Sequence, residues 1–256
     1  MTTELTDTVE YYLVFEQDFL HVNQVLDRRL SINFLRYECM NCKKQKKVFR
    51  NGFCYQCHIS LPQAGEWVMR PELSRAHLDQ EDRDLAFEKE MQLAPHVVYL
   101  ANSSNVKVGV TRKSQVPTRW IDQGAHEAIE VVECPNRYLA GITEVALMKH
   151  VSDKTSWREM LTNNLKDLDL EKIKHDLKEY IPLEVKDYYL ENSKELEIKY
   201  PVLKYPQSVK TLNLGKHPFY EGVLKGIKGQ YLIFEDGVVF NVRSHEGFVV
   251  SLNVTN

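Results

Sequence analysis

The chain contains no long apolar run and carries little net charge. No stretch approaches the eighteen apolar residues that a membrane-spanning helix needs. Residues 1–7 show neither the basic segment nor the apolar core of a secretory signal. We therefore expect a cytoplasmic protein without a membrane partner, in a reducing compartment.

Two phosphate-cradling patterns, GxGxxG and GxxxxGK[ST], do not occur, so no small-molecule cofactor is expected. The 256 residues are 43% hydrophobic and 27% charged, which is typical of a soluble chain that folds into two or three small units. The net charge of −3 does not favour nucleic acid as a partner. A basic run favours nucleic acid locally, although such a run is also typical of a solvated loop. It consists of Lys43, Lys44, Lys46, Lys47 and Arg50.

Cysteines are few, yet four of the five form two CxxC pairs, Cys39/Cys42 and Cys54/Cys57. Each pair aims two thiolates at one point, and together they complete a tetrahedral zinc site. Four protein ligands leave no open position, so the zinc is expected to be structural. A redox role would need only one pair, and no thioredoxin-like pattern surrounds either. Cys134 is expected to be a buried thiol at a strand end.

The order of elements predicts an α+β protein. Residues 9–16 and 128–132 are typical of strands, and the polar turn 102–105 separates two apolar runs as in a hairpin. Residues 137–150 predict a helix with one buried face, capped by Asn136. The expected units are residues 1–62 (strands and zinc ribbon), 63–94 (connector), 95–165 (α/β domain), 166–205 (helical segment) and 206–256 (antiparallel β module with an Asp236-Gly237 turn).

Several short motifs carry a resemblance to known proteins. Val97-Val98-Tyr99, Lys107-Val108-Gly109, Arg119 and Glu144 resemble the motif series of the GIY-YIG nuclease superfamily, over about residues 95–165. Nearly the whole chain resembles an uncharacterised bacterial family that pairs an N-terminal cysteine-rich segment with such a domain. The stretches that carry this second resemblance are residues 96–101, 107–112, 119–125 and 226–232.

The superfamily resemblance implies a three-stranded sheet flanked by helices, with Mg²⁺ or Mn²⁺ bound by Glu144. It places Tyr99 beside the attacking water, Lys107 where a second tyrosine usually stands, and Arg119 on the scissile phosphate. His126 is a looser candidate, since its distance from Arg119 exceeds the usual interval. The closing asparagine of the pattern is either Asn163 or Asn164.

The residue types suit phosphodiester hydrolysis. Arginine is planar and permanently charged, so it fits the non-bridging phosphate oxygens. A tyrosine or lysine near a metal ion and an arginine can have its pKa lowered enough to accept a proton. Structural alternatives remain: Tyr99 as a core aromatic, Lys107 as a solvated strand residue, and Arg119 with Glu144 as an ion pair.

The sequence thus predicts a divalent-metal-dependent nuclease-like protein that acts on DNA or RNA. The alternative is a nucleic-acid-binding or adaptor protein, whose nuclease-like domain is degenerate and whose zinc is structural.

Overall fold

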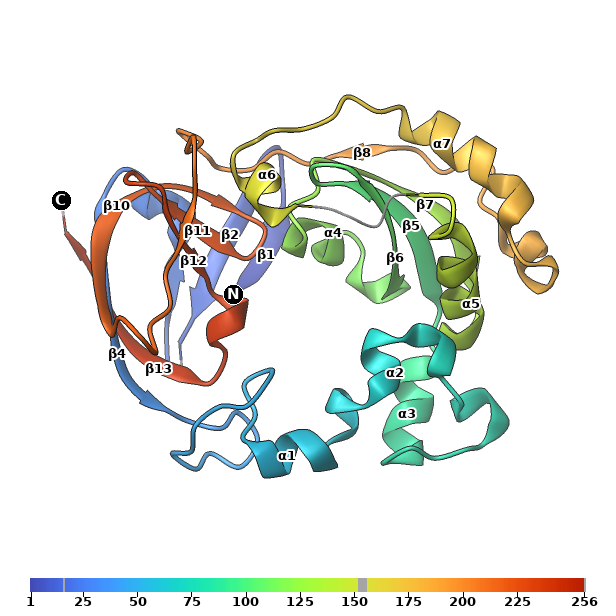
Figure 1. Ribbon diagram of the computed structural model, residues 1–256, viewed down its shortest axis with the longest axis horizontal. Coiled ribbons are helices and arrows are strands. Elements are labelled where there is room, and N and C mark those ends of the chain that lie inside the picture. The colour runs from blue at the N-terminus through green and yellow to red at the C-terminus, as the bar shows by residue number, and fades with distance from the viewer. Residues whose placement is uncertain (16, 152–155, 256) are drawn as a thin grey trace.

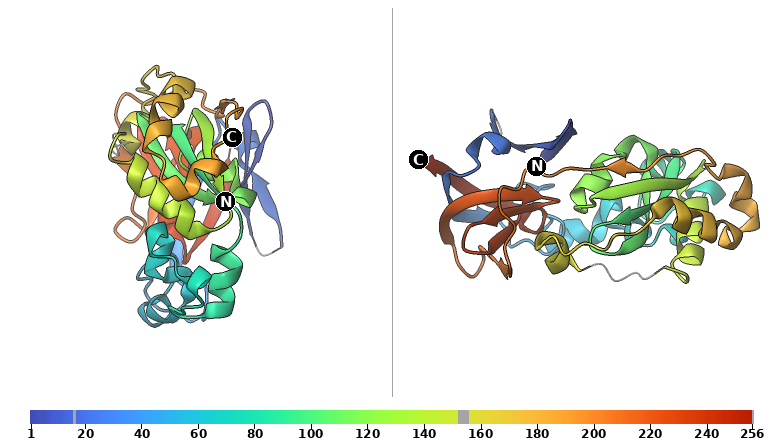
Figure 2. Two further views of the ribbon diagram at one scale, coloured as in Figure 1. Left: turned by 90° about the vertical axis from the view of Figure 1, so that its right-hand side faces the viewer. Right: turned by 90° about the horizontal axis from the view of Figure 1, so that it is seen from above.

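The computed structural model describes residues 1–15, 17–151 and 156–255 as a mixed α+β fold with three sheets (Figure 1). A six-stranded sheet and a four-stranded sheet occupy the two ends of an elongated molecule (Figures 1 and 2). The segment with α1 (Tyr55–Ser60), α2 (Glu66–Met69) and α3 (Leu85–Gln92) runs along one side, from the six-stranded sheet to the four-stranded sheet. None of the helices in the described ranges is long and apolar enough to cross a membrane.

The six-stranded sheet has the order β13-β4-β10-β11-β12-β9. Its strands are β4 (Arg29–Tyr37), β9 (Lys210–Thr211), β10 (Phe219–Lys228), β11 (Tyr231–Phe234), β12 (Val238–Asn241) and β13 (Phe248–Thr255). The expected turn at Asp236-Gly237 is confirmed: it joins β11 to β12, and Gly237 has a φ of 81°. One strand of this sheet, β4, comes from the N-terminal part of the chain and pairs with β13 on one side and β10 on the other.

A smaller sheet from the N-terminus packs against this one. It consists of β1 (Thr2–Leu5), β2 (Val9–Val14) and β3 (Phe19–His21). The strand predicted over residues 9–16 is confirmed as far as Val14, and Glu16 lies outside the described residues. Val9 and Tyr11 of β2 are fully buried in one cluster with Leu30 and Ile32 of β4. The short sheet therefore covers the larger one by burying apolar surface.

The four-stranded sheet contains the predicted hairpin. Its order is β6-β5-β7-β8, with β5 (His96–Asn102), β6 (Val106–Arg112), β7 (Glu127–Cys134) and β8 (Leu196–Glu197). All neighbours are antiparallel, and Tyr99 of β5 pairs with Gly109 of β6. The expected three strands are thus joined by a fourth, β8, from the segment predicted to be helical. Cys134 is buried at the end of β7, as expected.

Helices cover the two faces of this sheet differently. Val98 and Leu100 point to the face that packs with α5 (Arg137–Leu147) and α7 (Leu170–Leu177). Because side chains alternate along a strand, Val97 and Tyr99 point the other way, toward Trp120 of α4 (Thr118–Asp122). The predicted N-cap is confirmed, since the Asn136 side chain accepts a hydrogen bond from Leu139 N at 3.0 Å.

The connector lies against α5 at one point of very close approach. The remaining helices are α1 (Tyr55–Ser60), α2 (Glu66–Met69), α3 (Leu85–Gln92) and α6 (Trp157–Leu161). A Cβ atom on Gly141 of α5 would lie 2.3 Å from the backbone N of Glu72. Only glycine permits this contact, which fixes α2 and α3 beside the four-stranded sheet.

Candidate functional site

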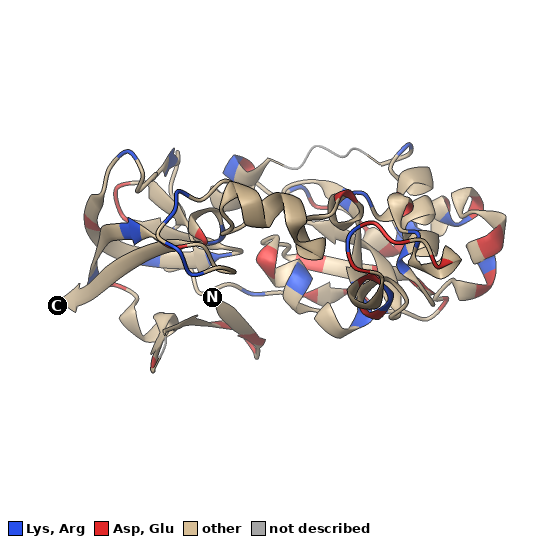
Figure 3. Ribbon diagram, turned by 90° about the horizontal axis from the view of Figure 1, so that it is seen from below, with Lys and Arg blue, Asp and Glu red and all other residues tan. Residues whose placement is uncertain are grey.

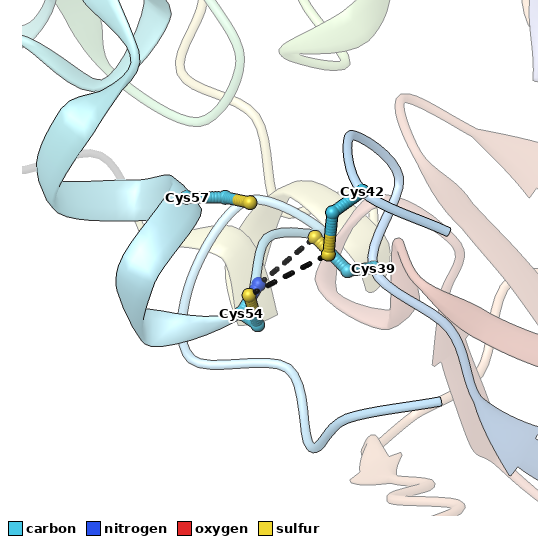
Figure 4. A group of neighbouring side chains, drawn as sticks. All are labelled: Cys39, Cys42, Cys54 and Cys57. Carbon is cyan, nitrogen blue, oxygen red and sulfur yellow. Dashed lines mark hydrogen bonds between the residues drawn. The ribbon is translucent and has the colours of Figure 1, made fainter. Parts of the chain in front are cut away.

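The four paired cysteines form one cluster that can bind a metal ion such as zinc. Their sulfur atoms all lie within 4.8 Å of one another (Figure 4). Cys39 and Cys42 come from the loop after β4, whereas Cys54 precedes α1 and Cys57 lies in its first turn. The arrangement agrees with the predicted ligand set.

Local backbone geometry brings the two pairs together. Asn51 and Gly52 have φ angles of 51° and 74°, which make the tight turn that returns the chain to Cys54. The Gly52 carbonyl accepts a hydrogen bond from Met40 N at 2.9 Å, so the second turn is held against the first. Burial raises the pKa of Cys39, but backbone N–H groups of Cys54, Cys42 and Asn41 outweigh it and lower that pKa to about 6. The thiolate favoured in this way is the form that binds metal.

The basic run lies on the loop that joins the two cysteine pairs. All five of its cationic residues are exposed. Figure 3 shows Lys and Arg segments on loops in this region, while the connector nearby carries acidic segments. The loop is accessible to an anionic partner.

Tyr99 lies at the centre of the four-stranded sheet, on the face away from α5. Its side chain is fully buried, and its ring lies over Gly109, where a Cβ would be 2.6 Å from the phenol oxygen. The hydroxyl makes no hydrogen bond of standard geometry with a described residue. Burial raises the pKa of Tyr99 to about 12, although the charge of Arg119 and the amide of Gln123 act in the opposite direction. Burial therefore outweighs the charge of Arg119 at this tyrosine, and the predicted lowering of its pKa depends on the metal ion as well.

Arg119 and Glu144 both lie near Tyr99. Arg119 is in α4 and Glu144 in α5, and both side chains are half-buried. The charge of Glu144 raises the pKa of Tyr99, while that of Arg119 lowers it. The charge of Glu144 also raises the pKa of Arg137, the first residue of α5. These side chains, drawn from a strand and two helices, share one electrostatic environment.

The other predicted residues lie farther along the sheet. Lys107 pairs with Ala101, and because paired residues point to one side, it shares the face of Tyr99 and Gly109. His126 immediately precedes β7, and its Nε2 is 3.2 Å from Glu127 Oε1. Asn163, one of the two candidate asparagines, accepts a hydrogen bond from Lys228 Nζ at 3.3 Å.

A cavity of about 420 Å³ is lined by four arginines. They are Arg112 from β6, Arg119 from α4, Arg137 from α5 and Arg243, which follows β12. Of the predicted catalytic residues, Arg119 is among those that line the cavity, and Tyr99, Lys107, His126 and Glu144 are not. Among the described residues, only Arg243 of the four forms an ion pair, to Asp122 Oδ2 at 3.5 Å. The cavity therefore concentrates positive charge in a chain whose net charge is negative.

Arg137 is held in place by the connector. It donates to the carbonyl oxygens of Trp67 at 3.2 Å and Val68 at 2.8 Å, and its guanidinium lies 5.6 Å from the centre of the Trp67 ring. Burial lowers the pKa of Arg137 to about 10, and the charges of Arg112 and Arg119 add to this effect. Cations that repel one another in a partly buried site favour the binding of an anion.

Local sequence patterns did not identify three of these arginines, Arg112, Arg137 and Arg243. One signal was available, because Arg137 is the first residue of a helix, where the positive end of the helix dipole disfavours a cation. Arg112 ends β6 and Arg243 follows β12, and neither carries a comparable signal. Their grouping depends on tertiary structure.

A comparison with known protein families found a match over most of the chain. A family model described as "Protein of unknown function (DUF2797)" matches residues 27–250. No curated protein and no solved structure matches the chain.

Proposed function

The chain belongs to the DUF2797 family, and we propose that it binds nucleic acid and hydrolyses its phosphodiester bonds with a divalent metal ion. The observation that carries this proposal is the gathering of four guanidinium groups around one cavity. One of the four, Arg119, interacts electrostatically with Tyr99, as Glu144 does. The resemblance to GIY-YIG nucleases, at Tyr99, Arg119 and Glu144, supports the same chemistry.

The arginines act on the phosphate. Each planar guanidinium can donate two parallel hydrogen bonds to non-bridging oxygens, and its charge offsets the charge that grows on phosphorus during attack. Arg119 is the arginine proposed to contact the scissile phosphate, because its charge also lowers the pKa of Tyr99. Arg137 is fixed by two backbone carbonyls, so little conformational entropy is lost when it binds.

Glu144 is the proposed ligand of a divalent cation. In the described part of the chain, the cysteine cluster is the only group of three or more candidate ligand atoms close enough to hold an ion. A single half-buried carboxylate nevertheless fits Mg²⁺, which commonly keeps several waters and takes its other ligands from substrate phosphate. Once bound, such a cation supplies a water of lowered pKa and offsets charge on the leaving oxygen.

Tyr99 is a positioning residue in this proposal. Burial raises the pKa of Tyr99 to about 12, so its phenol is protonated at neutral pH unless a bound cation lowers that pKa. The hydroxyl is fully buried, so it acts on the reaction through Arg119, with which it interacts, and not through direct contact with the substrate.

The cysteine cluster is proposed to be a zinc ribbon that braces the molecule. Its backbone joins β4 of the six-stranded sheet to the connector that lines the cavity. The exposed basic loop of the ribbon provides a further contact for the phosphate backbone.

A cleavage assay tests the proposal. Plasmid, single-stranded DNA and RNA are incubated with magnesium or manganese and either the wild-type protein, Glu144→Gln, or the exposed control Glu184→Gln. We expect the wild type and Glu184→Gln to cut at least one substrate, and Glu144→Gln to cut none. Cleavage that is unchanged in Glu144→Gln, or that needs no metal, contradicts the proposal.

A second candidate is nucleic-acid binding without turnover. It is favoured by the complete burial of Tyr99 and by the lack of a multi-carboxylate metal site among the described residues. Binding of nucleic acid by the wild type and both variants, with no cleavage of any substrate, selects this candidate.

A further inference from the structure

The arginine-lined cavity has a second, apolar wall. Trp67 and Met69 come from α2, and Phe87 and Met91 from α3, so the connector supplies one side and the sheet with its helices supplies the other. Phe87 is half-buried and Met69 is 83% exposed, so apolar surface remains available to a ligand. A site for phosphate alone would not need this wall.

The two walls are joined by direct contacts. Arg112 Nη1 lies 3.0 Å from Met91 Sδ, and Arg137 lies over the Trp67 ring. Cations and flat or polarizable side chains therefore occur side by side. This combination suits a ligand that carries an anionic group and a planar ring a short distance apart.

His96 adds a polar group to the same cavity. The residue is fully buried, its Nδ1 lies 2.7 Å from the Ala94 carbonyl oxygen, and its Nε2 makes no hydrogen bond within the described chain. A carbonyl oxygen can only accept, so Nδ1 carries the proton and Nε2 is an acceptor. The cavity thus offers donors for a phosphate, an aromatic surface, and one acceptor for a hydroxyl or amino group.

We propose that this cavity binds one nucleoside phosphate unit, with its phosphate on the arginines and its base against Phe87 and the neighbouring methionines. The inference rests on the proposed function and specifies its substrate class: an unpaired nucleotide of a single strand or strand end. A base inside a duplex is stacked on both sides and cannot present its face to Phe87. The same chemistry would also accept a free mononucleotide, and the test separates the two sources.

The test measures binding without cleavage. Glu144→Gln protein, without added magnesium or manganese, is titrated into a labelled short single-stranded oligonucleotide and into the corresponding duplex. We expect the single strand to bind roughly tenfold or more tightly than the duplex, since stacking of one base has an effect of that size. Adenosine monophosphate and inorganic phosphate are then added as competitors.

Phe87 supplies the decisive variants. Phe87→Ala should weaken single-strand binding by roughly tenfold and leave duplex binding unchanged, while Phe87→Tyr, which keeps the ring, should bind like the parent. Phe19→Ala is the matched control, because Phe19 is 59% exposed in β3 and is not among the residues that line the cavity. Melting temperatures of all variants identify any loss of binding that comes from unfolding.

The competitors identify the source of the ligand. Displacement of the strand by adenosine monophosphate at a similar concentration supports the cavity and assigns it to free nucleotides. Displacement only by single strands supports it and assigns it to nucleic acid. Equal affinity for strand and duplex, no loss on Phe87→Ala, or competition by inorganic phosphate as effective as that by the nucleotide overturns the inference. Because cleavage is measured separately, an inactive protein can still confirm this site, and an active nuclease can still lack it.

Discussion

The ring of Tyr99 lies directly over Gly109, its partner on the neighbouring strand, and no larger residue fits there. A Cβ at Gly109 would stand 2.6 Å from Cζ and from the phenol oxygen of Tyr99. The glycine thus fixes both the position of the ring and its burial. Through burial it also sets the protonation state of the hydroxyl.

Gly109→Ala should therefore displace Tyr99 and destabilise the fold. Overpacking of this kind costs about 1–3 kcal/mol, which chemical denaturation can measure as a change in the free energy of unfolding. Gly215→Ala is a suitable control, because Gly215 is exposed and its nearest neighbour is the end of a tyrosine side chain at 3.0 Å. Equal stability of the Gly109→Ala variant and the wild type would show that the ring does not depend on this contact.

His96 should make the protein sensitive to mild acid. Burial lowers the pKa of His96 to about 4, and the charges of Arg137 and Arg112 act in the same direction. An unfolded histidine has its ordinary pKa of 6.5, so between pH 6.5 and 4 the unfolded state binds more protons than the folded state. This contribution to stability is complete above pH 6.5 and is lost as the pH falls toward 4.

The variant His96→Asn isolates that effect, because asparagine keeps a donor near the position of Nδ1 and does not titrate. Denaturation curves at several pH values should show a smaller loss of stability for His96→Asn than for the wild type over this range. If the two proteins lose stability in parallel, His96 is not a source of the acid sensitivity.

Removal of one cysteine ligand should abolish metal binding. Cys39→Ser is expected to release the zinc and to unfold the loop between β4 and α1, since metal binding supplies the folding energy of such coreless segments. Elemental analysis should find one zinc per wild-type chain and less in Cys39→Ser. Cys134→Ala, at the buried cysteine outside the cluster, should keep its zinc. Full zinc content in Cys39→Ser would exclude the cluster as the site.

Elements set by short-range patterns could be predicted from the sequence. The hairpin around residues 102–105 follows from its alternation and its polar turn, and the α5 N-cap follows from Asn136. The two cysteine pairs likewise specify their cluster through spacing alone. In each case the residues that decide the structure are close together in the chain.

Long-range pairing could not be predicted in this way. The pairing of β4 with β10 and β13 joins segments from opposite ends of the chain, and no local pattern reports it. The arginine cavity is a similar case, because Arg112, Arg137 and Arg243 meet only after the sheets and the connector pack together. The raised pKa of Tyr99 also follows from burial, which the strand pattern does not quantify.

The most direct test of the account is the salt dependence of oligonucleotide binding by Arg119→Gln. Affinity for a single strand is measured over a range of salt concentrations, with Arg29→Gln as the control. Arg29 of β4 lies outside the cavity and forms an ion pair with Glu221 of β10. Loss of one phosphate contact should weaken binding about tenfold or more and reduce the slope of log affinity against log salt by about 0.7. If the affinity and the slope of Arg119→Gln both match those of the wild type, the claim that this cavity binds phosphate is contradicted.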